Sequence, residues 1–430
     1  MKIKLISFLA VVAAGVLVLL MTVSGQANIE SEYNTNIARA RSNAEREIPY
    51  NAYVYYNKAF EIRCEEAIYK EYLEQTKLLG EDFYVTAVEN YVVRFPMSFD
   101  AYETMTQMYY DRGKYHSVID VALEARGKGV ASDKVRDLYN ECAHMLKTIK
   151  SDVDEAQPFL GSYAMVKVNG LYGYIKTNGD FLLAPFYEGA SPMMGTNAAV
   201  NDGEEWHIIN SGGFKVARTS EPVDYMGILV GGKIPVAKNG RYGYATSALI
   251  IPENLPYDYA SNFKNGVAAV RKGDKWALIN TEEVLITEFV FDDVLLDEYE
   301  TCHNGGVIFV KKNGKYYMAN AAGNKITEQG FDDAKPFVGN DPAAVCINGQ
   351  WGFVAADGNM VIQPQYEGAN SFSIGLAGVC IDGLWGYINS SGTIRVPCQF
   401  EECKPFSGAG IAVVKQDEVW KYVQLLSYQQ

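Results

Sequence analysis

The sequence is poor in the residues and motifs that most enzymes and metal sites use. Only four of its 430 residues are histidines, which disfavours histidine-based catalysis and sites with several histidine ligands. It contains no H-E-x-x-H, no G-x-S-x-G and no phosphate-binding G-x-x-x-x-G-K-[ST] motif. We therefore expect no enzyme, no cofactor, no metal site and no catalytic residue.

The seven cysteines do not form a disulfide framework, because they are sparse, odd in number and without C-x-x-C spacing. Cys398 and Cys403 are close enough in sequence to pair across a bend, and a bond between them stays open as an alternative. Cys346 and Cys380 each precede a tryptophan by five residues. Related segments have lysine or alanine at that position, so we do not expect it to bind a ligand.

A net basic charge is also missing. The formal net charge is −14, with 20 acidic and 18 basic residues up to residue 150 and 32 and 20 after it, so the acidity lies in the second part. An acidic chain disfavours binding to nucleic acid or to an anionic lipid surface. The hydrophobic content of 48% is sufficient for a folded core.

The N-terminus carries an uncharged run, Leu5–Val23, behind Lys2 and Lys4. The run is longer than the roughly 7–15 residues of a cleavable signal core and falls within the ~17–25 residues of a membrane span. Lysines in front of it predict a cytoplasmic N-terminus and an exported body. We predict that residues 1–27 form a signal-anchor of a single-pass cell-membrane protein. Cleavage after Ala27, which would give a secreted protein, stays open.

Residues 28–150 hold only two prolines and repeat apolar residues at helical spacing. The clearest stretch is 98–130, where Gly113 separates two apolar stripes, and Pro96 ends the helix before it. This pattern resembles the tetratricopeptide repeat, a ~34-residue helical hairpin. The resemblance implies an α-helical domain of stacked hairpins whose first helices line a concave groove.

Four side chains of one first helix would face that groove: Glu103, Gln107, Tyr110 and Asp111. An acidic groove that also carries tyrosine favours a basic or amide-rich peptide. The alternative is a solvated helix face in a spacer that lifts the next domain off the membrane.

Residues 151–430 consist of internal repeats. Eight aromatic residues, which we call anchors, recur at intervals of 34 to 40 residues: Tyr172, Trp206, Tyr242, Trp276, Tyr316, Trp351, Trp385 and Trp420. An acidic residue, which we call the acidic mark, recurs in the same phase, usually 16 residues after an anchor: Asp154, Glu188, Asp224, Asp258, Asp292, Asp332, Glu367 and Glu401.

Each unit predicts short antiparallel strands joined by Asn-Gly or Asp-Gly, which suit two-residue hairpin turns with positive φ. Glycine after the anchor lets a neighbouring unit or ring approach closely. The domain begins and ends in mid-repeat, and its two end fragments are complementary halves. We therefore predict an all-β propeller of seven or eight blades, one of them completed by both ends of the domain. A β-solenoid is the alternative.

The units in which Trp-Gly is intact, NGQWGFVAADGN and DGLWGYINSSGT, resemble the WG-repeat family of bacterial proteins. The resemblance covers residues 154–430. It implies a repeat scaffold, frequently extracytoplasmic and often joined to other modules, without a general catalytic activity. It brings no catalytic residues with it.

Two features of the repeats could carry binding. The acidic marks could attract cations or a basic partner, but an acid that recurs in every unit more often accepts backbone N–H bonds and holds a bend. The longest anchor interval contains an insertion at residues 295–306. Its candidate binding residues are Asp297, Glu298, Tyr299 and His303, although a tolerated loop insertion is the commoner explanation.

These observations predict a non-enzymatic, extracytoplasmic, membrane-anchored scaffold that binds protein or peptide partners and no nucleic acid. A module that binds cell wall or carbohydrate is the alternative, since the chain has 30 tyrosines and many loop asparagines. A propeller hydrolase that uses acids at its centre is a third possibility, but no acid stands out from the repeat.

Overall fold

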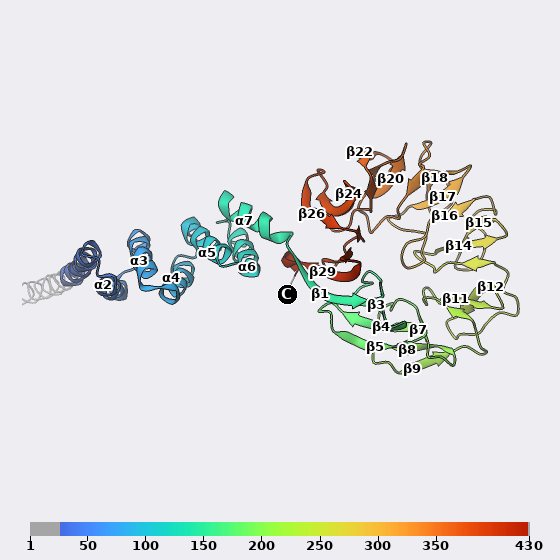
Figure 1. Ribbon diagram of the computed structural model, residues 1–430, viewed down its shortest axis with the longest axis horizontal. Helices are drawn as coiled ribbons and strands as arrows, with labels where there is room; N and C mark the ends of the chain where they lie inside the picture. The colour runs from blue at the N-terminus through green and yellow to red at the C-terminus, as the bar shows by residue number, and fades with distance from the viewer. Residues whose placement is uncertain (1–25, 429–430) are drawn as a thin grey trace, which may run out of the picture. The chain divides into compact units, whose positions relative to one another are not determined.

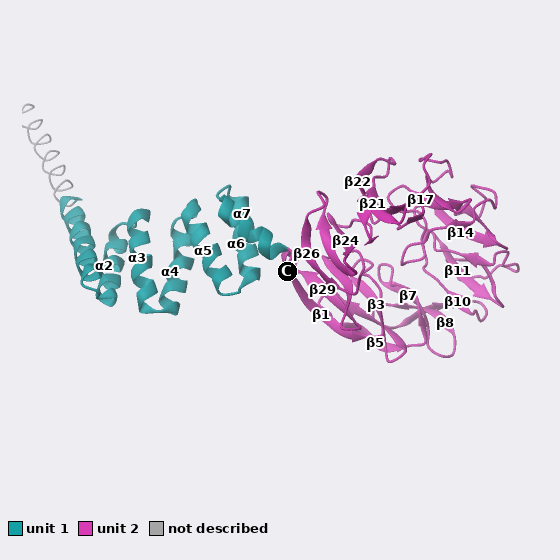
Figure 2. Cartoon of the chain, turned by 45° about the horizontal axis from the view of Figure 1, so that its top comes forward, with its two compact units in different colours: residues 1–143 teal, residues 144–430 magenta. Residues whose placement is uncertain are grey.

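The computed structural model describes residues 26–428, which fall into two compact units that divide between Ala143 and His144 (Figure 2). The uncharged run for which the sequence predicts a membrane anchor, Leu5–Val23, lies outside the described residues. Within residues 26–428, no helix is both long and apolar enough to cross a bilayer.

The first unit is a series of antiparallel helices. They are a helix at residues 26–45, α2 (Pro49–Ile62), α3 (Glu66–Leu79), α4 (Glu81–Arg94), α5 (Phe99–Asp111), α6 (Tyr115–Gly127) and α7 (Asp133–Ala143). Ser98 caps α5 by accepting the N–H of Ala101 at 3.1 Å, and Gly113, with φ +67°, separates α5 from α6. The hairpin predicted over residues 98–130 therefore forms, and α4 ends before Pro96 as expected.

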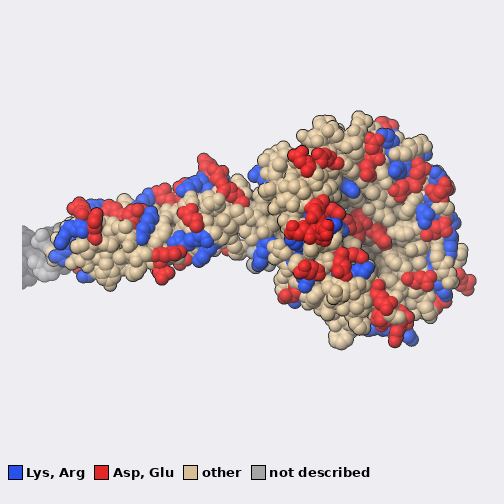
Figure 3. All heavy atoms as spheres, in the orientation of Figure 1, with Lys and Arg blue, Asp and Glu red and all other residues tan. Residues whose placement is uncertain are grey.

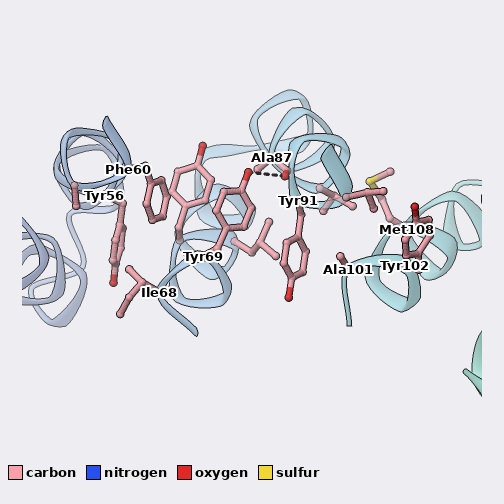
Figure 4. Packing of buried hydrophobic residues seen from close by; sticks show 14 of the residues in the cluster. Tyr56, Phe60, Ile68, Tyr69, Ala87, Tyr91, Ala101, Tyr102 and Met108 are labelled. Atoms are coloured by element: carbon pink, nitrogen blue, oxygen red, sulfur yellow. Dashed lines mark hydrogen bonds between the residues drawn. The ribbon is translucent and has the colours of Figure 1, made fainter. Parts of the chain in front are cut away.

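Tyrosines form much of the core of this unit. Tyr56, Tyr69, Tyr91 and Tyr102 are all almost completely buried (Figure 4). The rings of Tyr69 and Tyr91 stack with centroids 5.2 Å apart, and the Tyr69 hydroxyl donates to the carbonyl of Ala87 at 3.0 Å. Each ring thus adds apolar area to the core while its hydroxyl keeps a hydrogen-bond partner.

The second unit is an eight-bladed β-propeller (Figure 1). Five blades have four strands each, and in four of these blades the strands follow one another along the chain. Blade 1 contains β2 (Glu155–Ala156), β3 (Tyr163–Val168), β4 (Leu171–Lys176) and β5 (Phe181–Tyr187), and blade 2 contains β6 (Gly189–Ala190), β7 (Asn197–Asn201), β8 (Trp206–Asn210) and β9 (Lys215–Arg218). Blade 6 contains β19 (Asp333–Ala334), β20 (Ala343–Ile347), β21 (Gln350–Val354) and β22 (Met360–Tyr366), and blade 7 contains β23 (Gly368–Ala369), β24 (Leu376–Ile381), β25 (Leu384–Asn389) and β26 (Ile394–Phe400).

Three consecutive blades have only three regular strands. Blade 3 contains β10 (Tyr225–Met226), β11 (Lys233–Lys238) and β12 (Arg241–Thr246), blade 4 contains β13 (Tyr259–Ala260), β14 (Val267–Lys272) and β15 (Lys275–Asn280), and blade 5 contains β16 (Asp293–Val294), β17 (Ile308–Lys312) and β18 (Lys315–Ala319). Irregular segments replace their outer strands and pair only through single bridges, such as Trp276 with Phe291. In blade 3 this segment contains Pro252 and Pro256, which have no N–H for a ladder.

Blade 8 is completed by both ends of the unit. It contains β27 (Glu402–Cys403), β28 (Ile411–Gln416) and β29 (Val419–Leu425), followed by a 3₁₀ turn at Leu426–Tyr428, and its outermost strand is β1 (Leu146–Val153). β1 pairs antiparallel with β29. The predicted closed ring of seven or eight blades is confirmed with eight blades, and the solenoid alternative is wrong. Residues 146–150, which we assigned to the helical segment, belong to the propeller. They pair with β29 and cover the edge that it would otherwise expose.

The glycine of the Trp-Gly motif makes room for the outer strand of its own blade. A Cβ at Gly352 would lie 2.6 Å from the carbonyl oxygen of Ile362, and Gly173 and Gly386 have the same close contact with their outer strands. In these three blades the glycine alone faces three residues of the outer strand, which bulges at that point. The expected close approach is present, but strand backbone of the same blade makes it.

Candidate interaction surfaces

The acidic marks lie on one face of the propeller, next to the hairpin turns between the second and third strands. Seven of the eight accept backbone N–H bonds from the turn of their own blade, as the sequence favoured. For example, Asp154 accepts from Gly170 at 2.9 Å, and Glu367 accepts from Gly383 at 3.0 Å. The turns have the expected geometry, with φ +52° at Asn348 and +80° at Gly349.

Three acidic marks also join neighbouring blades. Each pairs with the basic residue just before the anchor of the preceding blade: Arg241 with Asp258, Lys275 with Asp292, and Lys315 with Asp332. The lysines hold the pKa of Asp292 and of Asp332 below the usual range. On the visible face of the propeller, acidic side chains gather in several groups, and basic side chains lie beside some of them (Figure 3). No group of side chains in residues 26–428 has the composition of a metal site.

The anchors are packing residues. Trp206 is 8% exposed, and its indole N–H donates to the carbonyl of Asp224 in the next blade at 3.0 Å. Cys346 and Cys380 lie directly opposite Trp351 and Trp385 on the adjacent strand. All seven cysteines are free thiols, so the bond that we left open between Cys398 and Cys403 is absent.

The insertion at residues 295–306, which we call the channel plug, crosses the inside of the ring. It joins β16 to β17 in blade 5, yet the Tyr299 hydroxyl donates to the carbonyl of Phe159 in blade 1, on the opposite side, at 3.0 Å. Glu298 pairs with Lys404 of blade 8 at 2.9 Å. The plug therefore ties blade 5 to the far side of the propeller.

The predicted binding residues of the plug have partners within the protein. Asp297 accepts the N–H of Tyr299 at 3.0 Å and the N–H of Thr301 at 2.8 Å, which folds the plug on itself. His303 is only 7% exposed, neither ring nitrogen has a hydrogen-bond partner, and burial lowers its pKa. The binding role of these residues stays a prediction, and their contacts show a structural one.

Sequence reasoning missed Glu300, which joins the plug to blade 3. Its carboxylate accepts the hydroxyl of Tyr225 in blade 3 at 2.5 Å. The Tyr225 ring belongs to a continuous row of aromatic contacts with neighbouring centroids 5.4 to 6.0 Å apart: Trp206, Tyr225, Tyr242, Tyr259 and Trp276. A tyrosine follows the acidic mark only in blades 3 and 4. This departure from the repeat was the one sequence feature that could have pointed to the contact of Tyr225 with the plug.

In the helical unit, one of the four predicted groove residues lines an open groove. Glu103 borders a cavity of about 290 Å³ between α3 and α5, together with Lys70, Lys77 and Tyr84. The lining also contains Asp100 and Glu74, which pair with Lys70 and Lys77, so charges of both signs line the groove and its three acids outnumber its two lysines. The expected acidic character of the groove stays a prediction. The two lysines lie on α3, which α4 separates from α5 in the chain, so only the fold brings α3 and α5 together.

The other three predicted groove residues interact with neighbours. The Gln107 amide donates to the Asp111 carboxylate at 2.7 Å. Glu141 of α7 hydrogen-bonds the Tyr110 hydroxyl and raises the pKa of Tyr110 to about 12. Tyr110 therefore contacts α7, while Glu103 remains the predicted residue best placed to meet a partner.

The family described as WG containing repeat matches residues 257–276, 277–316, 351–385 and 385–420. Each match ends at an anchor, and the last two span one anchor interval each. Residues 257–316 and 351–420 therefore carry WG repeats. A β-propeller that contains WG repeats indicates a protein-interaction scaffold.

Solved structures resemble the chain only distantly. A structure described as "Crystal structure of the eukaryotic initiation factor" is 11% identical with a TM-score of 0.38, over 64% of this chain and 87% of that one. Hsv2 of Kluyveromyces lactis is 10% identical with a TM-score of 0.35, over 64% of this chain and 97% of that one. No curated protein sequence matches the chain.

Proposed function

We propose that this protein is a non-enzymatic scaffold held at the outer face of the cell membrane. It binds a protein or peptide partner in the groove of its helical unit. The observation that carries this proposal is the open groove of about 290 Å³ between α3 and α5, with both charge signs along its walls. Charges of both signs on the walls of a groove fix the orientation of a charged partner more than they raise its affinity.

We propose that the protein is not an enzyme because its recurring acidic side chains are engaged in holding the fold. Seven of the eight acidic marks hold turns, and three also pair with cations, so these carboxylates serve the fold. The chain also has few histidines and no catalytic motif.

Affinity capture with the full chain tests the groove. Glu103→Arg should reverse the charge on one wall and reduce capture of the partner about tenfold, a change of roughly 1.4 kcal/mol. Glu32→Arg is the matched control, because Glu32 is an exposed glutamate of the first described helix. Equal capture by the wild type and both variants would remove the groove from the proposal. Recovery of cell-wall or glycan material instead would favour the carbohydrate-binding alternative.

The proposed location at the outer face of the membrane rests on the uncharged run Leu5–Val23 and the two lysines before it. Protease added outside intact spheroplasts should digest residues 28–430, and a variant that lacks residues 1–27 should be protected inside. A wild-type body that is digested only after lysis would overturn the outer location. Release of the body into the medium would show cleavage after Ala27.

A further inference from the structure

A second cavity of the helical unit lies between α6 and α7, away from the α3–α5 groove. It measures about 150 Å³, and Ala122, Leu123, Ala131, Val135 and Tyr139 provide its apolar walls. Ala122 and Val135 are buried, whereas Leu123 at its edge is 43% exposed. The cavity thus presents an apolar floor that can be reached from solvent.

The size of the cavity selects the kind of occupant. Small-molecule sites usually enclose about 300–1,000 Å³, which is well above the volume of this cavity. Pockets that hold one anchoring side chain are a recurring feature of protein interfaces. The volume therefore suits a single large aliphatic side chain of a partner segment.

Two arginines border the cavity, Arg126 on α6 and Arg136 on α7. Arg136 is held in place, because it pairs with Asp133 and donates to the carbonyl of Ala131 at 3.2 Å. Arg126 is exposed, and across residues 26–428 no carboxylate or other acceptor takes up its guanidinium. Among the other arginines of the unit, Arg41, Arg63, Arg112 and Arg136 have carboxylate partners, and Arg39 and Arg94 lie over aromatic rings.

We propose that the α6–α7 cavity binds a partner segment in which a large aliphatic side chain stands next to a carboxylate. The aliphatic group fills the apolar floor, and the carboxylate pairs with Arg126. A planar guanidinium can donate two parallel hydrogen bonds to a carboxylate, which gives direction as well as attraction.

Methyl NMR on the full chain tests the site with two peptides, acetyl-Gly-Leu-Asp-amide and acetyl-Gly-Leu-Asn-amide. The methyl signals of Leu123 and Val135 should shift in a saturable way with the aspartate peptide. Binding of the asparagine peptide should be about tenfold weaker, which corresponds to roughly 1.4 kcal/mol. Arg126→Gln should remove the preference, and Arg46→Gln, at another exposed arginine, should keep it.

Equal affinity for the two peptides, or a preference that survives in Arg126→Gln, would overturn the proposal. Absence of any saturable shift would overturn it as well. A second variant, Leu123→Ser, alters only an exposed edge residue and should weaken both peptides alike. If Arg126 only stabilises the C-terminal end of α6, Arg126→Gln would lower the free energy of unfolding and leave peptide binding unchanged. That result would also overturn the proposal. Loss of this site would leave the α3–α5 groove untouched.

Discussion

The glycine after an anchor allows the outer strand of the same blade to lie close to the third strand. In blade 6 the outer strand bulges toward Gly352 between Ile362 and Tyr366, and Pro364 lies within this bulge. Proline fits there because a bulged residue need not donate to the ladder. The sequence predicted a close approach at this glycine. It could not name the neighbour, since the bulge appears only once the register of the two strands is known.

Replacing this glycine should be costly. Gly352→Ala places a Cβ within 2.6 Å of a backbone carbonyl oxygen, so the outer strand must shift. We expect a loss of about 1–3 kcal/mol in the free energy of unfolding of the propeller, measured by urea denaturation. Gly408→Ala is the control, because a Cβ at Gly408 meets nothing within 4 Å and its φ is ordinary. Equal stability of the two variants would contradict this reading of the Trp-Gly motif.

His303 should make the propeller sensitive to mild acid. Burial lowers its pKa in the folded state, with the Lys264 ammonium opposing its protonation as well. The unfolded chain therefore takes up a proton near the ordinary pKa of about 6.5 while the folded chain does not, so stability falls as pH drops through that value. The urea midpoint should fall between about pH 7 and pH 5.5, and it should fall less in His303→Gln. The same pH dependence in both would show that His303 is not responsible.

At the scale of the element, the channel plug has a structural role that its sequence did not reveal. The longer anchor interval located the insertion correctly, because repeat spacing is visible in one dimension. Its contacts with Phe159 and Lys404 join positions 140 and 106 residues away. Such pairs depend on closure of the whole ring, and no local pattern encodes them.

Exchange of the plug separates a structural role from a binding role. Residues 295–306 can be replaced by the short connection of blade 4, Ser261–Gly266, which links the equivalent strands. We expect a loss of roughly 2–4 kcal/mol in unfolding free energy, from several hydrogen bonds worth about 0.5–1.5 kcal/mol each. Capture of the partner should persist. Unchanged stability with lost capture would instead make the plug the recognition loop.

At the scale of the molecule, the repeat phase was enough to predict the closed ring. The two half-repeats at the ends of the domain predicted that both ends complete one blade, since an unpaired edge strand is open to aggregation. They did not predict that β1 is the strand that pairs with β29, because residues 146–150 were assigned to the helical segment. The helical groove was less predictable. Glu103 was identified from its own helix, whereas Lys70 and Lys77 enter the groove from a helix about thirty residues earlier.

The most direct test of the proposed scaffold is hydrogen exchange on the full chain, free and in complex with its captured partner. We predict that binding slows exchange in α3 and α5, which line the groove, and leaves the channel plug unchanged. Slower exchange confined to the propeller, with α3 and α5 as accessible as in the free chain, would contradict the groove as the binding site.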